Sequence, residues 1–287
     1  MSDVKESHEE RTANEPRETS LPGQWVDAFC PGIAKAGGFT ITSTPSKATS
    51  ASSERYIELA VKRSLDNPAA AWLWRDKQRI LGQTLQVRIG GSFVFPSPKA
   101  PSAFVKDRSV RVVFVAGGVG INPLISMATY LGELNKARSD AGEPDDAGCE
   151  VIFLHSVQIN RTSSPEDGGD DDSNDEITQI PFLPRLAALY GSKAIRGHLK
   201  VFLTSSNRSC DVLSCNGEDV PCMRRRITTA DLDAAVLGGS AGDSRELAST
   251  YVYLCGVPAM TDLFTQHLTS KEGLGLAADT VWCEKWW

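Results

Sequence analysis

The sequence predicts an α/β protein preceded by a small all-β unit: an antiparallel barrel, followed by a parallel sheet with helices on both faces. Up to about residue 95, short alternating segments are separated by Gly, Pro and Ser turns, which is typical of a small barrel or sandwich. After the proline-rich boundary at 96–101, strand patterns alternate with helical patterns, which is typical of a parallel sheet. With 287 residues, 41 % of them hydrophobic, the chain can bury a core in each unit.

The first unit is expected to span residues 21–101, because residues 1–20 are polar and charged, as in a disordered tail. A turn at 21–24 leads into a short strand. Apolar–polar alternation predicts further half-buried strands, and alanines behind a proline predict a short helix. The expected elements are strands at 39–45, 56–61 and 85–89, a polar linker at 46–53 and a helix at 67–73.

The second unit is expected to span residues 105–287 and to contain five parallel strands. Its first strand, at 111–115, is a β-branched and aromatic run, and apolar residues at helical spacing follow it over 124–131. Thr228 and Asp231 have the spacing of a capping box, which predicts a helix through 237. The other expected elements are strands at 151–155, 199–204, 251–254 and 279–283 and helices at 182–190 and from 258.

Charge is unevenly distributed along the chain. The formal net charge is −6, but residues 166–176 contain seven acidic and no basic residues, so the rest is near neutral. We interpret 160–178 as an acidic, disordered insertion. The basic cluster Arg224–Arg226 is interpreted as a solvated loop, and no nucleic-acid partner is expected. No apolar run approaches the ~18 residues of a membrane span.

The seven cysteines are odd in number and scattered, which favours a reducing compartment. Cys210, Cys215 and Cys222 do not have the spacing of an iron–sulfur or zinc site, so we interpret them as loop cysteines and expect no metal.

The glycine-rich turn after the first strand of the second unit is the strongest functional signal. The turn contains three glycines, Gly117, Gly118 and Gly120, and because they have no Cβ a ligand can approach the backbone amides closely. Pro123 suits the first turn of the helix that follows. Strand, glycine loop and helix start together favour a bound phosphate, although the same pattern also occurs as a plain turn. A second such loop follows Cys255, at the strand end where ligands of parallel sheets bind.

Several segments in order resemble one family. They are GQWVD (23–27), GGFTITSTP (37–45), AVKR (60–63), RIGGSFVFP (88–96), AGGVGINPLIS (116–126), YLCGVPAMTDLF (253–264) and CEKWW (283–287). Together they resemble the oxidoreductase NAD-binding domain-containing protein 1 family, a branch of the ferredoxin–NADP reductase-like flavoenzymes. The resemblance implies a flavin-binding barrel, a nucleotide-binding α/β unit, and hydride transfer between NAD(P)H and FAD, with an electron acceptor that the sequence does not identify.

The resemblance also implies site residues. The dinucleotide pyrophosphate would be held by Gly117, Gly118, Val119, Gly120, Asn122 and Pro123, and the nicotinamide by Cys255, Gly256, Pro258 and Met260. The flavin would contact Phe39, Thr40, Thr42, Ser43 and Lys62. The residues beside the reacting rings would be Thr40, Cys255 and the terminal Trp287. Glu284 is either a proton relay or, as we prefer from the sequence, a solvent-facing acid.

The chain departs from the family pattern in its flavin half. Gly37 and Phe39 stand where flavin-binding relatives have arginine and tyrosine, and Asn67 and Ala70 depart from the usual second phosphate loop. Relatives have two further strands before Gly23, so the barrel is expected to be truncated. These departures leave open a second reading, a nucleotide-binding protein that has lost flavin and redox activity and serves as a sensor or interaction module.

Cofactor preference and location are weaker expectations. Gln158 stands where a cation for the NADPH phosphate would be expected, and Arg161 borders the acidic stretch, so NADH is favoured over NADPH. The family resemblance implies a mitochondrial location. The alternative is the cytoplasm, because the first twenty residues contain too many acids for a presequence.

Overall fold

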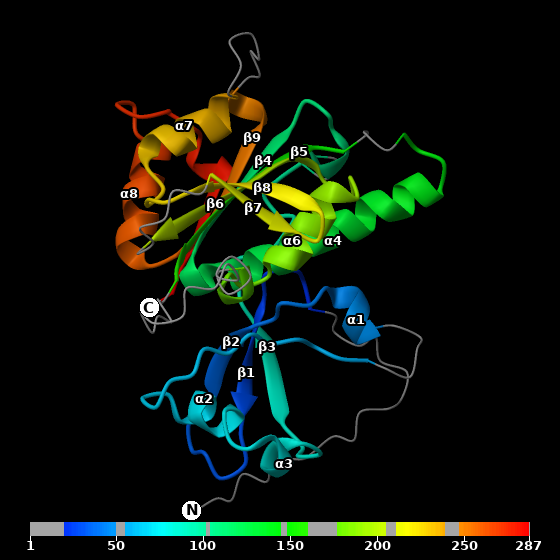
Figure 1. The fold of residues 1–287 in the computed structure, drawn as a ribbon, viewed down its shortest axis with the longest axis vertical. Helices are drawn as coiled ribbons and strands as arrows, with labels where there is room; N and C mark the ends of the chain where they lie inside the picture. Colours follow the sequence, from blue (N-terminus) through cyan, green and yellow to red (C-terminus); the bar gives the residue numbers. More distant parts are fainter. Residues whose placement is uncertain are drawn as a thin grey trace, which may run out of the picture.

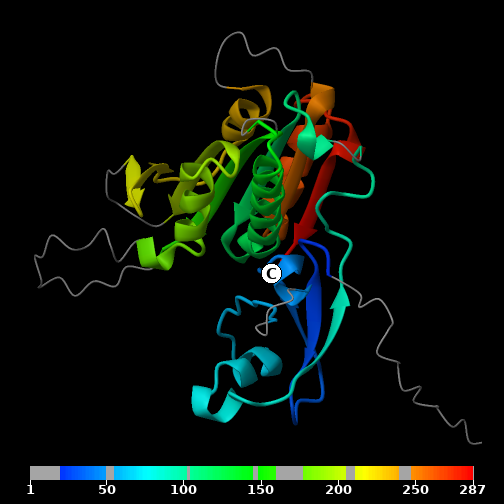
Figure 2. The ribbon, with the colours of Figure 1, turned by 90° about the vertical axis from the view of Figure 1, so that its right-hand side faces the viewer.

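The computed structural model describes residues 20–49, 55–101, 104–144, 148–159, 177–204, 211–238 and 247–286, which form two sheets (Figure 1). The expected N-terminal tail, the core of the acidic insertion, Arg161, Cys210 and Trp287 lie outside these residues. In Figures 1 and 2 the small sheet lies below the large one. Within the described residues, no helix has the length and apolar character needed to cross a membrane.

The small sheet is antiparallel and has the strand order β2-β1-β3. Its strands are β1 (Trp25–Phe29), β2 (Gly37–Thr40) and β3 (Gln86–Gly90). Three short helices accompany it: α1 (Pro45–Thr49), α2 (Pro68–Leu73) and α3 (Lys77–Ile80). Phe39 and Trp72 are the largest side chains of its core. Only these three strands are present in the described part of the unit, so the sheet does not close into a barrel there.

Parts of the first unit differ from the sequence predictions. The polar stretch expected as a linker contains helix α1. The alternating run at 56–61 is not a strand, because its only β pairing is an isolated bridge between Leu59 and Ile41. Helix α2 forms as predicted, and its N-cap is Asn67. Helix α3 was not predicted.

The large sheet has the order β10-β9-β4-β5-β6-β8-β7. Its five predicted parallel strands are present as β4 (Arg111–Gly117), β5 (Glu150–Gln158), β6 (Arg196–Thr204), β9 (Thr250–Gly256) and β10 (Val281–Lys285). A hairpin of β7 (Val212–Cys215) and β8 (Glu218–Met223) extends the sheet, with β8 parallel to β6. The predicted fold class is therefore confirmed, and the hairpin is an addition to it.

The hairpin corrects our interpretation of the cysteines. Cys215 ends β7 and Cys222 lies within β8, and both side chains are buried in the core rather than in a loop. Asn216 and Gly217 connect the two strands with positive φ angles of 55° and 82°. Two successive left-handed residues are what a tight two-residue hairpin turn requires.

Helices cover both faces of the large sheet. One core cluster contains β4 and β5 side chains such as Phe114 and Phe153 together with residues of α4 (Ile121–Asp140) and α6 (Leu183–Gly191). The other cluster joins the opposite face of the sheet to α7 (Thr229–Leu237) and α8 (Pro258–Thr269). The described residues also form 3-10 turns, namely η1 (Phe104–Lys106), η2 (Gly118–Gly120), η3 (Leu247–Ser249) and η4 (Ala278–Thr280). The predicted capping box at Thr228 is confirmed.

Candidate functional site

The two predicted glycine loops lie next to each other at one edge of the large sheet. Strands β4 and β9 are parallel neighbours, with Ala116 opposite Cys255. Both carboxyl ends therefore lie at the same edge, and the polypeptide leaves each of them through a glycine into a helix. Strands β5 and β6 lie on one side of β4, whereas β9 and β10 lie on its other side, so the strand order reverses between β4 and β9. Such a position is where parallel sheets bind nucleotides.

Close packing explains why glycines occupy this edge. A Cβ on Gly120 would overlap the main-chain carbonyl of Cys255. A Cβ on Gly256 would lie 2.6 Å from Cε of Met260 and 3.2 Å from Cα of Gly117, so the two loops touch through bare backbone. Gly118 is different, because it is exposed, has a φ of +55°, and has open space around its Cβ position.

Two helix N-termini converge on these loops without side-chain caps. Helix α4 begins after Gly120 and helix α8 after Val257, and neither N-cap residue makes a capping side-chain hydrogen bond. The first amides of a helix carry partial positive charge and need acceptors. Gly118 and Val119 on one loop, and Val257 and Ala259 on the other, are exposed residues that carry an N–H, whereas Pro258 has none. The donor set therefore fits an anion with two charges, such as a pyrophosphate.

Cys255 lies at the end of β9 beside an acidic residue. Its side chain is fully buried, and burial, followed by the charges of Glu284 and Cys283, raises the pKa of its thiol well above the ordinary value. Glu284 is its register partner on β10 and accepts a hydrogen bond from Nε1 of Trp286 at 3.0 Å. Burial raises the pKa of Glu284, although the Trp286 bond opposes this shift. Glu284 is half-buried and faces Cys255 rather than solvent alone, which the prediction of a solvent-facing acid did not include.

The expected flavin contacts Thr42 and Ser43 are buried and bonded to one partner residue. The Thr42 hydroxyl donates to the main-chain carbonyl of Glu58 at 3.1 Å, and the Ser43 hydroxyl accepts from the Glu58 amide at 3.0 Å. Helix α4 adds two bonds to the same region, from Ser126 Oγ to the Ser43 carbonyl at 2.8 Å and from Asn122 Nδ2 to the Ala60 carbonyl at 3.0 Å. The bonds from Ser126 and Asn122 attach Ser43 and Ala60 to helix α4 of the large unit.

Ionic contacts strengthen this attachment. Arg185 of α6 donates from Nη2 to both carboxylate oxygens of Glu58, at 2.8 and 2.9 Å, and its guanidinium lies 5.1 Å from the ring centroid of Phe182. Glu133 of α4 accepts from the hydroxyls of Thr44 and Ser46 at 2.9 and 2.8 Å. Two helices of the large unit thus determine where the polypeptide leaving β2 runs.

The remaining expected flavin residues are scattered over the small unit. Thr40 is buried and opposite Trp25 in the small sheet, Phe39 is in its core, and Lys62 is exposed after the Leu59 bridge. Trp287 lies outside the described residues.

Two positions bear on whether this unit fits the phosphates of FAD. A Cβ on Gly37 would lie 2.6 Å from Cβ of Ala69 and 2.7 Å from Cε2 of Phe39, so the arginine of flavin-binding relatives has no room here. The Asn67 side chain accepts from the amides of Ala69 and Ala70, both at 3.1 Å, so the first amides of α2 already have an acceptor. These residues do not provide the phosphate contacts of the family pattern.

The described residues contain no group of three or more His, Cys, Asp or Glu side chains that could hold a metal ion. The polar groups described at the candidate site are main-chain amides, the Cys255 thiol, the Glu284 carboxyl, the Trp286 indole N–H and the Asn122 side-chain amide.

The architecture, a small antiparallel sheet before a parallel sheet with helices on both faces, belongs to the ferredoxin reductase-like class. A point mutant of ferredoxin-NADP+ reductase from Plasmodium falciparum, solved with 2′P-AMP, aligns over 93 % of this chain and 84 % of its own, with a TM-score of 0.56 at 12 % identity. The FAD/NAD-binding domain of nitric oxide dioxygenase from Vibrio cholerae aligns over 94 % and 86 %, with a TM-score of 0.52 at 14 % identity. At these identities the likeness shows the fold.

Sequence relatives show the family. Oxidoreductase NAD-binding domain-containing protein 1 of Bos taurus is 31 % identical over 268 residues, which cover 92 % of this chain and 71 % of the relative. The protein of the same name from Xenopus laevis is 30 % identical over 281 residues, with coverages of 94 % and 71 %. No family model matches the chain. The chain belongs to the oxidoreductase NAD-binding domain-containing protein 1 family, as the resemblance of its motifs predicted.

Proposed function

We propose that this protein is an NAD(P)H-dependent oxidoreductase that transfers a hydride between a nicotinamide dinucleotide and FAD, with an electron acceptor still to be identified. The observation that carries the proposal is the joined pair of glycine loops, with two uncapped helix N-termini directed at one edge of the sheet. The family name and the ferredoxin reductase-like fold support the same class of reaction.

In this proposal the backbone binds and the buried side chains exclude water. The amides around Gly118 and Val119 would bind the pyrophosphate, and Cys255, Gly256, Pro258 and Met260 would line the nicotinamide pocket. Because burial keeps the Cys255 thiol protonated at neutral pH, it would present a small uncharged surface to the ring rather than a nucleophile. Bound FAD would supply the hydride acceptor, and the protein's contribution is to align the two rings.

A charge placed at Gly118 tests the pyrophosphate site. Asp and Asn both tolerate a left-handed backbone, and the site has room for either, so Gly118→Asp and Gly118→Asn differ mainly in charge. A unit charge about 4 Å from a phosphate costs about 1 kcal/mol in bulk water and more near a protein surface, so Gly118→Asp should weaken NADH and NADPH binding at least fivefold relative to Gly118→Asn. Calorimetry measures both affinities. Equal affinities in the two variants, or no response of the wild type to either dinucleotide, would refute the site.

A second candidate function is favoured by the small unit. The surroundings of Gly37 leave no room for a phosphate-binding arginine, and the Asn67 side chain already bonds to the first amides of α2. The alternative to the oxidoreductase is therefore a nucleotide-binding sensor that has lost flavin. Purified protein should be examined for a yellow chromophore, and NADH-driven reduction of an artificial dye should be measured with and without added FAD. Dye reduction that depends on FAD supports the oxidoreductase, whereas dinucleotide binding by a colourless protein that reduces no dye supports the sensor.

A further inference from the structure

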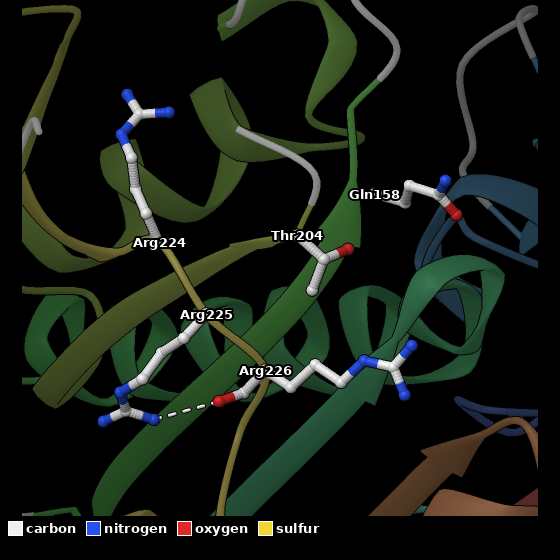
Figure 3. A pocket seen from close by; sticks show the side chains of 5 residues that line it. All are labelled: Gln158, Thr204, Arg224, Arg225 and Arg226. Atoms are coloured by element: carbon white, nitrogen blue, oxygen red, sulfur yellow. Dashed lines mark hydrogen bonds between the residues drawn. The ribbon is translucent and has the colours of Figure 1, made fainter. Parts of the chain in front are cut away.

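The carboxyl ends of β5 and β6 form an open pocket that the glycine loops do not include. Gln158 ends β5, Thr204 ends β6, and the run Arg224–Arg226 follows β8; together they line a volume of about 330 Å³ (Figure 3). The sequence alone predicts a solvated loop for the three arginines. Pairing of β8 with β6 instead brings them to the same sheet edge as the candidate dinucleotide site.

The pocket lies at the ends of the strands that are one and two places along the sheet from the glycine loop of β4. Gly117 is opposite Ser156 on β5, and Gln158, two residues further on, is opposite Thr204 on β6. With about 5 Å between neighbouring strands, the ends of β4 and β6 are about 10 Å apart. A dinucleotide with its pyrophosphate on the glycine loop and its nicotinamide toward β9 would extend its adenosine over β5 and β6.

One arginine is used to hold the loop in place. Arg225 makes a two-pronged ion pair with Asp231, with Nη2 2.8 Å from Oδ1, and its guanidinium lies 5.3 Å from the ring centroid of Phe202. Burial of Asp231 opposes ionisation, but the hydrogen bonds from Arg225 and Thr228 outweigh it and lower the pKa of Asp231 to about 2. This pair connects the arginine run to the start of α7.

Arg226 is the arginine available to a ligand. Its side chain is exposed and makes no hydrogen bond or ion pair with the part of the chain that the structure describes. In Figure 3 it extends to the same side as Gln158, whereas Arg224 and Arg225 turn to the other side. The described residues that line the pocket are three arginines, a glutamine and a threonine, with no Asp or Glu among them, and the Arg226 guanidinium is the one that extends toward Gln158.

The charge of this lining bears on which of the two nicotinamide cofactors would fit. A site for NADH commonly uses a carboxylate to bind the ribose 2′-hydroxyl, whereas a site for NADPH uses arginine against the 2′-phosphate. A phosphomonoester carries a charge of about −1.5 to −2 at pH 7, and a guanidinium can bind two of its oxygens. Among the described residues, no Asp or Glu lines the pocket at the ends of β5 and β6. The Arg226 guanidinium extends toward this end of β5.

We infer that this pocket binds a phosphomonoester, and that with a dinucleotide on the glycine loop the group is the 2′-phosphate of NADPH, paired with Arg226. Gln158 and Thr204 supply the neighbouring amide and hydroxyl. The inference rests on the proposed function and reverses the preference for NADH expected from residues 156–161 alone. It makes Arg226 the residue that determines cofactor specificity.

The test compares Arg226→Gln with Arg79→Gln, which removes an exposed arginine of α3 in the small unit. Affinities for NADPH, NADH, 2′-AMP and inorganic phosphate are measured by calorimetry at one low salt concentration. The wild type and Arg79→Gln should bind NADPH at least tenfold more tightly than NADH. Arg226→Gln should weaken NADPH and 2′-AMP at least tenfold while changing NADH less than twofold.

The outcomes separate this inference from the proposed function. Equal wild-type affinities for NADPH and NADH, or an equal loss of both in Arg226→Gln, would overturn the inference and leave the proposed function standing. Binding of 2′-AMP that depends on Arg226, in a protein that binds neither dinucleotide, would support the pocket and overturn the proposed function. Binding of inorganic phosphate at Arg226 without a preference for NADPH would overturn the assignment to the cofactor.

Discussion

His155 provides the sharpest test of the large sheet, because it is a buried histidine without a hydrogen-bond partner among the described residues. It lies on β5 between Ala116 of β4 and Val201 of β6, and its side chain is fully buried. Neither ring nitrogen has a partner in the part of the chain that the structure describes. An unpaired buried polar group costs about 1–3 kcal/mol. His155→Leu, a change of similar volume to an apolar side chain, should therefore stabilise the protein by about 1 kcal/mol at pH 7.

The same environment makes stability depend on pH with a definite sign. Burial lowers the pKa of His155 from 6.5 to about 3. The imidazole is therefore protonated below about pH 6.5 in the unfolded chain but only below about pH 3 in the folded chain. Stability is unaffected well above pH 6.5 and falls as the pH decreases through this window. Integrating the difference in bound protons between about pH 7 and pH 5 gives a loss of about 2 kcal/mol from His155 alone.

Urea unfolding at pH 7 and pH 5 measures this loss. The stability advantage of His155→Leu over the wild type should grow by about 2 kcal/mol between the two pH values, since all other titrating groups cancel in the comparison. His155→Gln serves as the control, because it removes the titration but keeps a buried polar group; it should show the flatter pH dependence without the gain at pH 7. If the wild type and both variants lose the same stability between pH 7 and pH 5, His155 is not buried and unpaired as described.

Three further predictions concern the site edge. Gly120→Ala forces a Cβ into the Cys255 carbonyl and should lower the free energy of unfolding, measured in urea, by at least about 2 kcal/mol. Gly118→Ala has open space around its Cβ and should lose only the ~1 kcal/mol of a left-handed backbone. Equal losses in the two variants would contradict the packing. Asp231→Asn should lower the free energy of unfolding by about 1–2 kcal/mol at pH 7, a value reduced for the solvent exposure of its partner Arg225. This difference from the wild type should disappear as the pH falls from 3.8 to about 2, because the ionised Asp231 carboxylate that stabilises the folded state becomes protonated in that range. At about pH 8 a thiol reagent should modify exposed Cys283 quickly and buried Cys255 only on unfolding, so rapid native-state labelling of Cys255, detected by peptide mass, would count against its raised pKa.

The glycine loop of β4 was predictable because its determinants are local. A buried strand, a tight turn and a helix start each follow from short-range rules, and the structure contains them in that order. The run at 56–61 shows where such rules fail, since its alternation fits a strand. Its main chain pairs with the segment after β2 only at the Leu59–Ile41 bridge, where the Thr42 amide donates to the Glu58 carbonyl. Its other bonds run to the side chains of Thr42, Ser43 and Asn122, so side-chain partners limit the pairing to one bridge.

The arginine pocket could not be predicted without the hairpin that positions it. Gln158 and Arg226 are far apart in sequence, and they meet only because β8 pairs with β6 through two residue pairs, Val201 with Cys222 and Phe202 with Met223. A signal for the hairpin was present, because Asn216-Gly217 is a strong two-residue turn sequence between alternating segments. Interpreting the cysteines as loop residues concealed that signal.

The two halves of the candidate site depend on different kinds of structure, and this makes them separable. The dinucleotide half is backbone geometry enforced by packing, since Gly120 must fit against Cys255 whatever ligand is present. The proposed flavin half depends on individual side chains: Gly37 stands where the family pattern has arginine, and the Asn67 side chain already accepts from the first amides of α2. Loss of flavin would therefore leave the glycine loops unchanged, because the close contacts of Gly120 and Gly256 all lie within the large unit. A colourless protein that still binds a dinucleotide is thus a physically consistent outcome, and dinucleotide affinity should be measured whether or not FAD is found.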